Sequence, residues 1–126
     1  MKFLIIDDED IARSVLSGFL IVLYPDAHID VCCDGFEALS WLANGRGKEY
    51  QYIFCDFNMP MMNGYEVIKQ CLEENKVEPH RIILITGSGV TQAEMEANIR
   101  KTLQLGIRGA LTKPFSCDNI KRILSV

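Results

Sequence analysis

Apolar residues recur along this chain with two alternating periods. Five short runs have the length of β-strands and are rich in apolar residues, at residues 2–7, 28–33, 50–55, 81–86 and 108–112. Between these runs, apolar residues return every third or fourth position, which is typical of one face of an α-helix. The pattern therefore predicts a regular alternation of strand and helix that begins with a strand and ends with a helix.

Polar and glycine residues mark where the predicted helices begin. The first helix follows Asp10, whose side chain we expect to cap it. The second helix follows Gly35, the third follows Asn63-Gly64, and the last covers Cys117 to Leu124. Apolar residues at every fourth position are expected to face the core: Ile11, Val15, Phe19 and Leu23 in the first helix, and Met95, Ile99 and Leu103 in the fourth.

The alternation of five strands with five helices predicts an α/β fold. Its parallel sheet is expected to carry helices on both faces, because each strand-to-strand crossover contains a helix. Right-handed crossovers leave only a few doubly wound topologies. In such sheets, ligands bind beyond the carboxyl ends of the strands, so the residues at those ends are the candidates for function.

The bulk composition fits one globular domain, which we expect to span residues 1–126. Hydrophobic residues make up 48% and charged residues 24% of the chain, and the formal net charge is −4. This charge offers no general attraction to nucleic acid or to an anionic membrane surface. No apolar stretch is long enough for a signal peptide or a membrane span. The five cysteines form no CxxC pair, and we expect buried, reduced thiols in a cytoplasmic protein.

Polar side chains stand where the predicted strands end. The first strand ends at Asp7-Asp8, the third is followed by Asp56, the fourth ends at Thr86, and Lys113 follows the fifth. The carboxyl ends of parallel strands meet at one edge of a sheet, so we expect these five side chains to converge. Asp and Thr at strand ends are often only helix caps, but their convergence with a lysine favours function.

The acids near the first strand need a cation. Two carboxylates about 4 Å apart repel by about 4 kcal/mol at an effective dielectric near 20. Mg²⁺ prefers one or two carboxylates together with water and phosphate oxygens. The sequence therefore predicts a site for Mg²⁺ and an anion. Glu9, between Asp8 and Asp10, is interpreted as a solvated loop acid.

Four segments make the whole chain resemble the receiver domains of two-component response regulators, in particular the chemotaxis regulators. They are "LIIDDED" (4–10), "CDFNMPMMNGYEV" (55–67), "LITGSG" (84–89) and "LTKPF" (111–115). The resemblance implies a flavodoxin-like receiver fold. It also implies that a sensor histidine kinase or a histidine phosphotransfer protein is one partner, and that a downstream effector or output domain is the other.

The same resemblance implies a role for each residue at the strand ends. Asp56 is expected to accept the phosphoryl group as an acyl phosphate, while Lys113 and Thr86 contact phosphoryl oxygens. Lys113–Pro114 is expected to be a cis peptide bond. The expected Mg²⁺ ligands are Asp7 (mainly through water), Asp8, Asp56 and the backbone carbonyl of Asn58. The domain is expected to be a signalling receiver rather than an enzyme acting on other substrates.

Two features depart from the family pattern and concern the signalling face. An aromatic residue usually stands three positions before the lysine, where this chain has Ala110. Thr86 and Lys113 are 27 positions apart, several more than is usual. We therefore expect the switch to run through the loop Gly87–Gly89 and the start of the fourth helix.

Two other functions remain open from the sequence. Asp8 and Asp10 have the D-x-D spacing of Mg²⁺-dependent phosphatases of the haloacid dehalogenase type, although Asp56 then has no role. A degenerate receiver, an interaction module without phosphorylation, is favoured by Ala110 and disfavoured by the complete set of acids and Lys113.

Overall fold

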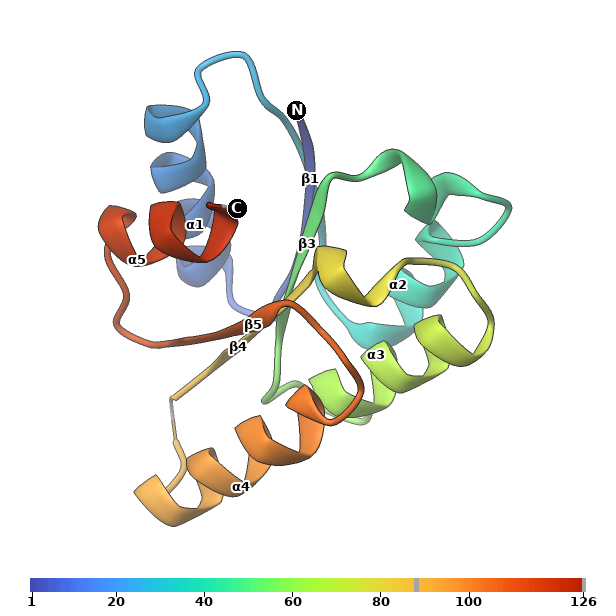
Figure 1. The fold of residues 1–126 in the computed structure, drawn as a ribbon, viewed down its shortest axis with the longest axis vertical. Helices are drawn as coiled ribbons and strands as arrows, with labels where there is room; N and C mark the ends of the chain where they lie inside the picture. The colour runs from blue at the N-terminus through green and yellow to red at the C-terminus, as the bar shows by residue number, and fades with distance from the viewer. Residues whose placement is uncertain (88, 126) are drawn as a thin grey trace.

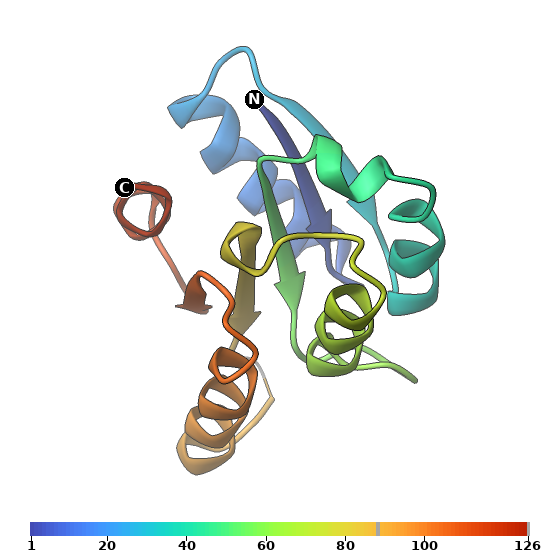
Figure 2. The same ribbon diagram turned by 45° about the vertical axis from the view of Figure 1, so that its right-hand side comes forward.

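One parallel sheet organises this protein, in a computed structural model that describes residues 1–87 and 89–125. The strands lie in the order β2–β1–β3–β4–β5. Their bounds are β1 Lys2–Ile6, β2 His28–Cys32, β3 Tyr52–Asp56, β4 Ile82–Thr86 and β5 Gly109–Thr112. Every neighbouring pair is parallel, and the arrows of β1, β3 and β4 share one direction in Figure 2. The doubly wound α/β fold predicted from the sequence is confirmed.

Helices cover both faces of the sheet. They are α1 Asp10–Leu23, α2 Gly35–Trp41, α3 Gly64–Glu73, α4 Gln92–Leu103 and α5 Cys117–Leu124, with short 3₁₀ turns η1 Arg46–Glu49 and η2 Pro79–Arg81. Helices α1 and α5 lie together on one side of the strands, and α2 and α3 lie on the other (Figure 1). Helix α4 packs beside α3 and extends past the end of the sheet (Figure 1).

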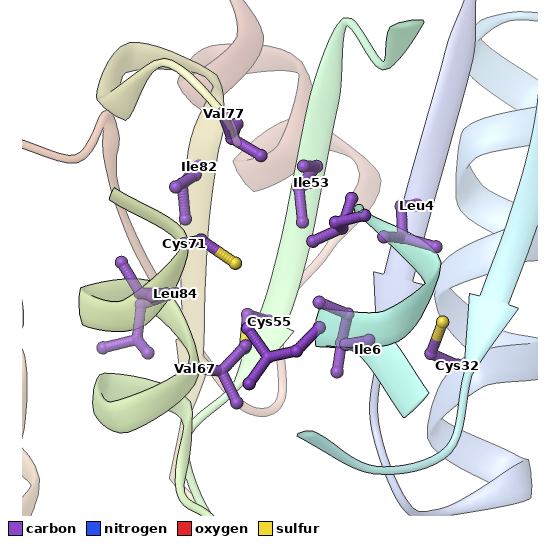
Figure 3. Packing of buried hydrophobic residues seen from close by; sticks show 14 of the residues in the cluster. Leu4, Ile6, Cys32, Ile53, Cys55, Val67, Cys71, Val77, Ile82 and Leu84 are labelled. Atoms are coloured by element: carbon purple, nitrogen blue, oxygen red, sulfur yellow. The ribbon is translucent and has the colours of Figure 1, made fainter. Parts of the chain in front are cut away.

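Alternating strand residues build two separate cores, because successive side chains point to opposite faces of a sheet. Leu4 and Ile6 of β1 belong to the core under α2 and α3, where Figure 3 shows them with Ile53, Cys55 and Val67. Phe3 and Ile5 belong instead to the core under α1 and α5. The central strands β1, β3 and β4 are buried on both faces, which explains their nearly continuous apolar runs in the sequence.

The predicted inner face of α1 is partly wrong. Ile11 and Val15 are 79% and 47% exposed, whereas Leu16 and Leu20 are buried. Apolar residues occur on two stripes of this helix, and a repeat of four cannot tell which stripe meets the sheet. Packing on the sheet and beside α5 buries the stripe that contains Leu16 and Leu20. Similarly, Leu103 of α4 is exposed, although it continues the spacing of Met95 and Ile99.

Among the described residues, four helices begin with a capping side chain, which in α4 is Thr91, but Asp10 is not one of these caps. Asn63 and Ser116 form capping boxes at α3 and α5, and Asp34 accepts a hydrogen bond from the backbone N–H of Glu37 in α2. Asp10 is instead the first residue of α1, and its carboxylate pairs with Arg13. The predicted cap at Asp10 is therefore wrong. The predicted strand bounds differ by one or two residues, since β3 begins at Tyr52 and includes Asp56.

The cysteines are free thiols, and three of them are buried. Cys32, Cys55 and Cys71 belong to the core under α2 and α3 (Figure 3). Cys33 is exposed and Cys117 is partly exposed, so the expectation of buried thiols holds for only part of the set. Burial raises the pKa of Cys71 to about 11, so this thiol is protonated near neutral pH.

Candidate functional site

The strand ends are held side by side by backbone hydrogen bonds. The N–H of Asp7, one residue beyond β1, donates to the carbonyl of Cys32 at 3.1 Å. On the other side of the sheet, the N–H of Lys113 donates to the carbonyl of Thr86 at 2.8 Å. Each pairing aligns the ends of two strands, and β3 ends at Asp56. The carboxyl edge of the sheet therefore carries Asp7, Asp56, Thr86 and Lys113.

Three carboxylates form a cluster at this edge. Asp7, Asp8 and Asp56 each place an oxygen within 4.8 Å of the others. Asp7 and Asp56 are buried, whereas Asp8 is exposed. Hard carboxylate oxygens with one side open to water are the donor set that suits Mg²⁺, which retains several of its waters. The residues present therefore fit the ion that the sequence predicts.

The ammonium of Lys113 lies between the two buried acids. Its Nζ is 3.2 Å from Asp56 Oδ1 and 3.3 Å from Asp7 Oδ2. Burial alone would lower the pKa of Lys113, but Asp56 and Asp7 raise it above its ordinary value. The lysine therefore remains charged. Its single positive charge is shared between the carboxylates of Asp7 and Asp56.

The pKa of Asp56 is raised to about 7. Burial is the largest cause, and the neighbouring charge of Asp7 adds to it, while Lys113 opposes both. Without a metal ion, Asp56 is therefore partly protonated near neutral pH. A cation beside it would favour the ionised carboxylate, which is the nucleophilic form.

Thr86 carries a buried hydroxyl without a partner. The residue is fully buried at the end of β4, and its Oγ1 makes no hydrogen bond to any residue that the structure describes. A buried polar atom left unpaired costs about 1–3 kcal/mol. This atom fits the role of a donor to an incoming oxygen at the carboxyl edge.

Gly64 sets the shape of the loop after Asp56. A Cβ at Gly64 would lie only 2.4 Å from the carbonyl oxygen of Asp56. The N–H of Gly64 donates to the carbonyl of Phe57 at 2.8 Å, so α3 starts directly against the end of β3. Asn58 lies in the loop between them and is partly buried. The glycine is required because only hydrogen fits this approach.

On the opposite side of the site, the Lys113–Pro114 peptide bond is cis, as the resemblance implies. The backbone of Gly87, with φ of 142°, passes so close that a Cβ there would lie 3.0 Å from the carbonyl oxygen of Lys113. Ser88, at the centre of the loop expected to carry the switch, lies outside the described residues.

Two residues near the site were not recognised from the sequence. Glu9, interpreted as a solvated acid, is exposed, but its Oε1 lies 3.8 Å from Lys113 Nζ. Arg13 donates from its Nη1 to the backbone carbonyl of Asp7 at 2.7 Å. Glu9 directly follows Asp8, which could have drawn attention to it. Arg13 carries no comparable signal, because its reach depends on where α1 begins.

Known proteins of one family match nearly the whole chain. A model of the response regulator receiver domain matches residues 3–125. A chemotaxis protein CheY homolog from Campylobacter jejuni is 29% identical over 124 residues, which are 98% of this chain and 89% of that protein.

Solved structures of similar proteins share the fold. A receiver domain protein from Clostridium thermocellum has a TM-score of 0.78 at 20% identity, over 97% of this chain and 89% of that one. The receiver domain of a sensor histidine kinase from Pseudomonas aeruginosa has a TM-score of 0.74 at 23% identity, over 98% of this chain and 93% of that one. That structure is described with a magnesium ion coordinated in its active-site cleft.

Proposed function

Because this chain belongs to the family of response regulator receiver domains, we propose that it accepts a phosphoryl group on Asp56 and switches a partner's activity. The observation that carries the proposal is the buried Asp56 carboxylate with Lys113 Nζ at 3.2 Å and two further acids within 4.8 Å. Phosphoryl transfer depends mainly on positioning and on neutralising phosphoryl oxygens. In this proposal, Asp56 is positioned to receive the phosphoryl group, and Lys113 can neutralise a phosphoryl oxygen.

The metal ligands in this proposal are those implied by the family. Asp8 and Asp56 would bind Mg²⁺ directly, Asp7 mainly through water, and Asn58 through its backbone carbonyl. A bound Mg²⁺ supplies positive charge next to the phosphoryl oxygens. The exposure of Asp8 supports this arrangement, because it leaves room for water ligands.

The residues of the chain then carry the transfer. A carboxylate oxygen of Asp56 forms a bond to phosphorus while the bond from phosphorus to the donor's histidine nitrogen breaks. The ammonium of Lys113 moves from the carboxylates to a phosphoryl oxygen. The Thr86 hydroxyl, which has no partner among residues 1–87 and 89–125, donates to a second phosphoryl oxygen.

A protein donor is favoured by the surface next to the site. A hollow of about 350 Å³ adjoins Asp7 and Lys113, and it is lined by apolar residues such as Leu16 and Phe115. Val15 lines the same hollow and is exposed, as is Ile11. These residues suit contact with a sensor histidine kinase or a histidine phosphotransfer protein. The phosphorylated domain would then act on an effector protein or output domain.

The proposal places the domain in the cytoplasm, which is typical of receivers and agrees with five free cysteines. Within the described residues, no helix has the length and apolar character to cross a membrane. With a net charge of −4, this domain is not expected to contact nucleic acid or a membrane surface itself.

The phosphatase alternative loses its main support in the structure. Its D-x-D motif needs Asp10 beside Asp8, but Asp10 pairs with Arg13. The carboxylate cluster at this edge consists of Asp7, Asp8 and Asp56 among the described residues.

The proposal is tested with acetyl phosphate and Mg²⁺, followed by intact-mass analysis. Wild type should gain one phosphate, as acetate leaves and an acyl phosphate forms on Asp56. Asp56→Asn should gain none, because the amide is nearly isosteric but not nucleophilic. Asp26→Asn, at an exposed turn, serves as the control and should be labelled like wild type. Undiminished labelling of Asp56→Asn would overturn the proposal.

A further inference from the structure

Glu9 stands at the N-cap of α1 but does not cap the helix. Its backbone has φ −99° and ψ 122°, and its side chain makes no capping hydrogen bond. Short polar side chains are preferred at this position because they can cap the free N–H groups. Capping therefore does not explain the direction in which the Glu9 carboxylate extends.

The Glu9 carboxylate extends instead toward Lys113. Its Oε1 lies 3.8 Å from Nζ, on the same ammonium that contacts Asp7 and Asp56. The backbone of Glu9 is held in place, because its N–H donates to Asp7 Oδ1 at 3.0 Å. Of the three carboxylates that pair with Lys113 among the described residues, Glu9 is the exposed one, and it is not among the Mg²⁺ ligands expected for the family.

We infer that Glu9 is a positioning residue that tunes the site: it restrains Lys113 and opposes the arrival of an anionic phosphodonor, while it favours the metal ion. The inference rests on the proposed function. To reach a phosphoryl oxygen, Lys113 must move away from the carboxylates that surround it. The negative charge of Glu9 then lies close to a phosphoryl group of the same sign, and like charges in a partly buried site repel.

The charge of Glu9 has opposite effects on the two ligands. It makes the electrostatic potential at the edge of the sheet more negative. A more negative potential attracts Mg²⁺ and repels an anionic phosphodonor. Neutralising it should therefore strengthen the binding of an anion and weaken the binding of a cation. A residue that only supports the local fold would, when altered, weaken both.

The test compares Glu9→Gln with wild type in two measurements. Initial rates of phosphorylation by acetyl phosphate at saturating Mg²⁺ give KM and kcat, and calorimetric titration gives the Kd for Mg²⁺ alone. For Glu9→Gln, we expect KM for acetyl phosphate to fall about three- to tenfold with kcat changed less than about twofold, and the Kd for Mg²⁺ to rise about two- to fivefold.

Two variants separate charge from other effects. Asp10→Asn has the same change in net charge one residue away, but the Asp10 carboxylate is engaged by Arg13, so both constants should stay within about twofold of wild type. Glu9→Asp keeps the charge and should retain the wild-type values more closely than Glu9→Gln.

The outcomes distinguish this inference from the proposed function. If Glu9→Gln weakens both ligands, Glu9 has a structural role, and if it matches wild type, Glu9 is a solvated acid; either result overturns the inference alone. If wild type takes up no phosphate at all, the proposed function fails, and the inference fails with it.

Discussion

At the scale of single residues, the titration of Asp56 links the site to stability. Its pKa is about 7 in the folded chain, compared with an ordinary value of 3.8. Between these two values the folded protein holds a proton that the unfolded chain has already released. The free energy of unfolding of the metal-free protein therefore falls as the pH rises through this window, and it levels off above it.

The Asp56→Asn variant checks this linkage. One pKa unit corresponds to about 1.4 kcal/mol, so the Asp56 contribution to the decrease is at most about 4 kcal/mol between pH 4 and pH 7. The variant should lose this part of the pH dependence and be the more stable protein at pH 8. Urea denaturation with EDTA at several pH values measures both curves. Parallel curves for the two proteins would show that Asp56 does not titrate in this window.

Two glycines should respond in opposite directions to a methyl group. A Cβ at Gly64 meets the carbonyl oxygen of Asp56 at 2.4 Å, whereas nothing lies within 4 Å of one at Gly18 in α1. We expect Gly64→Ala to lower the free energy of unfolding by about 2–3 kcal/mol through overpacking. Gly18→Ala should raise it by about 0.5–1 kcal/mol through helix propensity. Equal effects in urea denaturation would contradict this account of Gly64.

At the scale of elements, the end of α5 depends on an arginine outside the helix. Arg108 donates from Nε to the carbonyl of Ile123 at 2.7 Å and from Nη2 to those of Leu124 and Ser125 at 3.3 and 3.0 Å. Its guanidinium also lies 5.0 Å from the ring centroid of Tyr52. The last carbonyls of a helix have no partner within it, so Arg108 satisfies them and ties α5 to the sheet.

Replacing Arg108 should loosen α5 more than the rest of the fold. We expect Arg108→Ala to lower the free energy of unfolding by about 2–3 kcal/mol, because several hydrogen bonds to a charged group are lost. Hydrogen exchange should accelerate first in the amides of α5. Arg122→Ala, at an exposed position of the same helix, is the control and should change stability by less than about 0.5 kcal/mol. Equal losses in both variants would argue against the clamp.

At the scale of the whole molecule, Mg²⁺ should stabilise the fold, because it binds the assembled carboxylates and not the unfolded chain. We expect millimolar MgCl₂ to raise the Tm of wild type above its value in EDTA. Asp8→Asn should have a higher Tm in EDTA, since one repelling charge is gone, but a smaller rise with Mg²⁺. Coinciding melts of wild type with and without the ion would count against the metal site.

The route of the switch also concerns the whole molecule. Ala110 is partly buried against the core under α2 and α3, and it has no ring to move when Thr86 turns toward a phosphate. We expect a phosphate mimic such as beryllofluoride to change hydrogen exchange across residues 89–99 and to leave β5, Gly109–Thr112, nearly unchanged. The largest change in β5 would show that another route operates.

The sequence alone determined the class of fold and the residue types at the site. The central strands β1, β3 and β4 are apolar on both faces, and each connection is helical, so a parallel sheet follows from local patterns alone. Because parallel strands end at one edge, the sequence alone was enough to place four side chains together, namely Asp7, Asp56, Thr86 and Lys113. The roles given to these residues come from the family resemblance and stay predictions.

Only the tertiary structure decided which of several local possibilities was realised. The two apolar stripes of α1 are equivalent in the sequence, and packing on the sheet buried Leu16 and left Ile11 exposed. In the same way, the titration of Asp56 and the reach of Glu9 to Lys113 depend on burial and on contacts across the chain. A local pattern specifies which side chains are available, but their energies depend on neighbours that folding brings together.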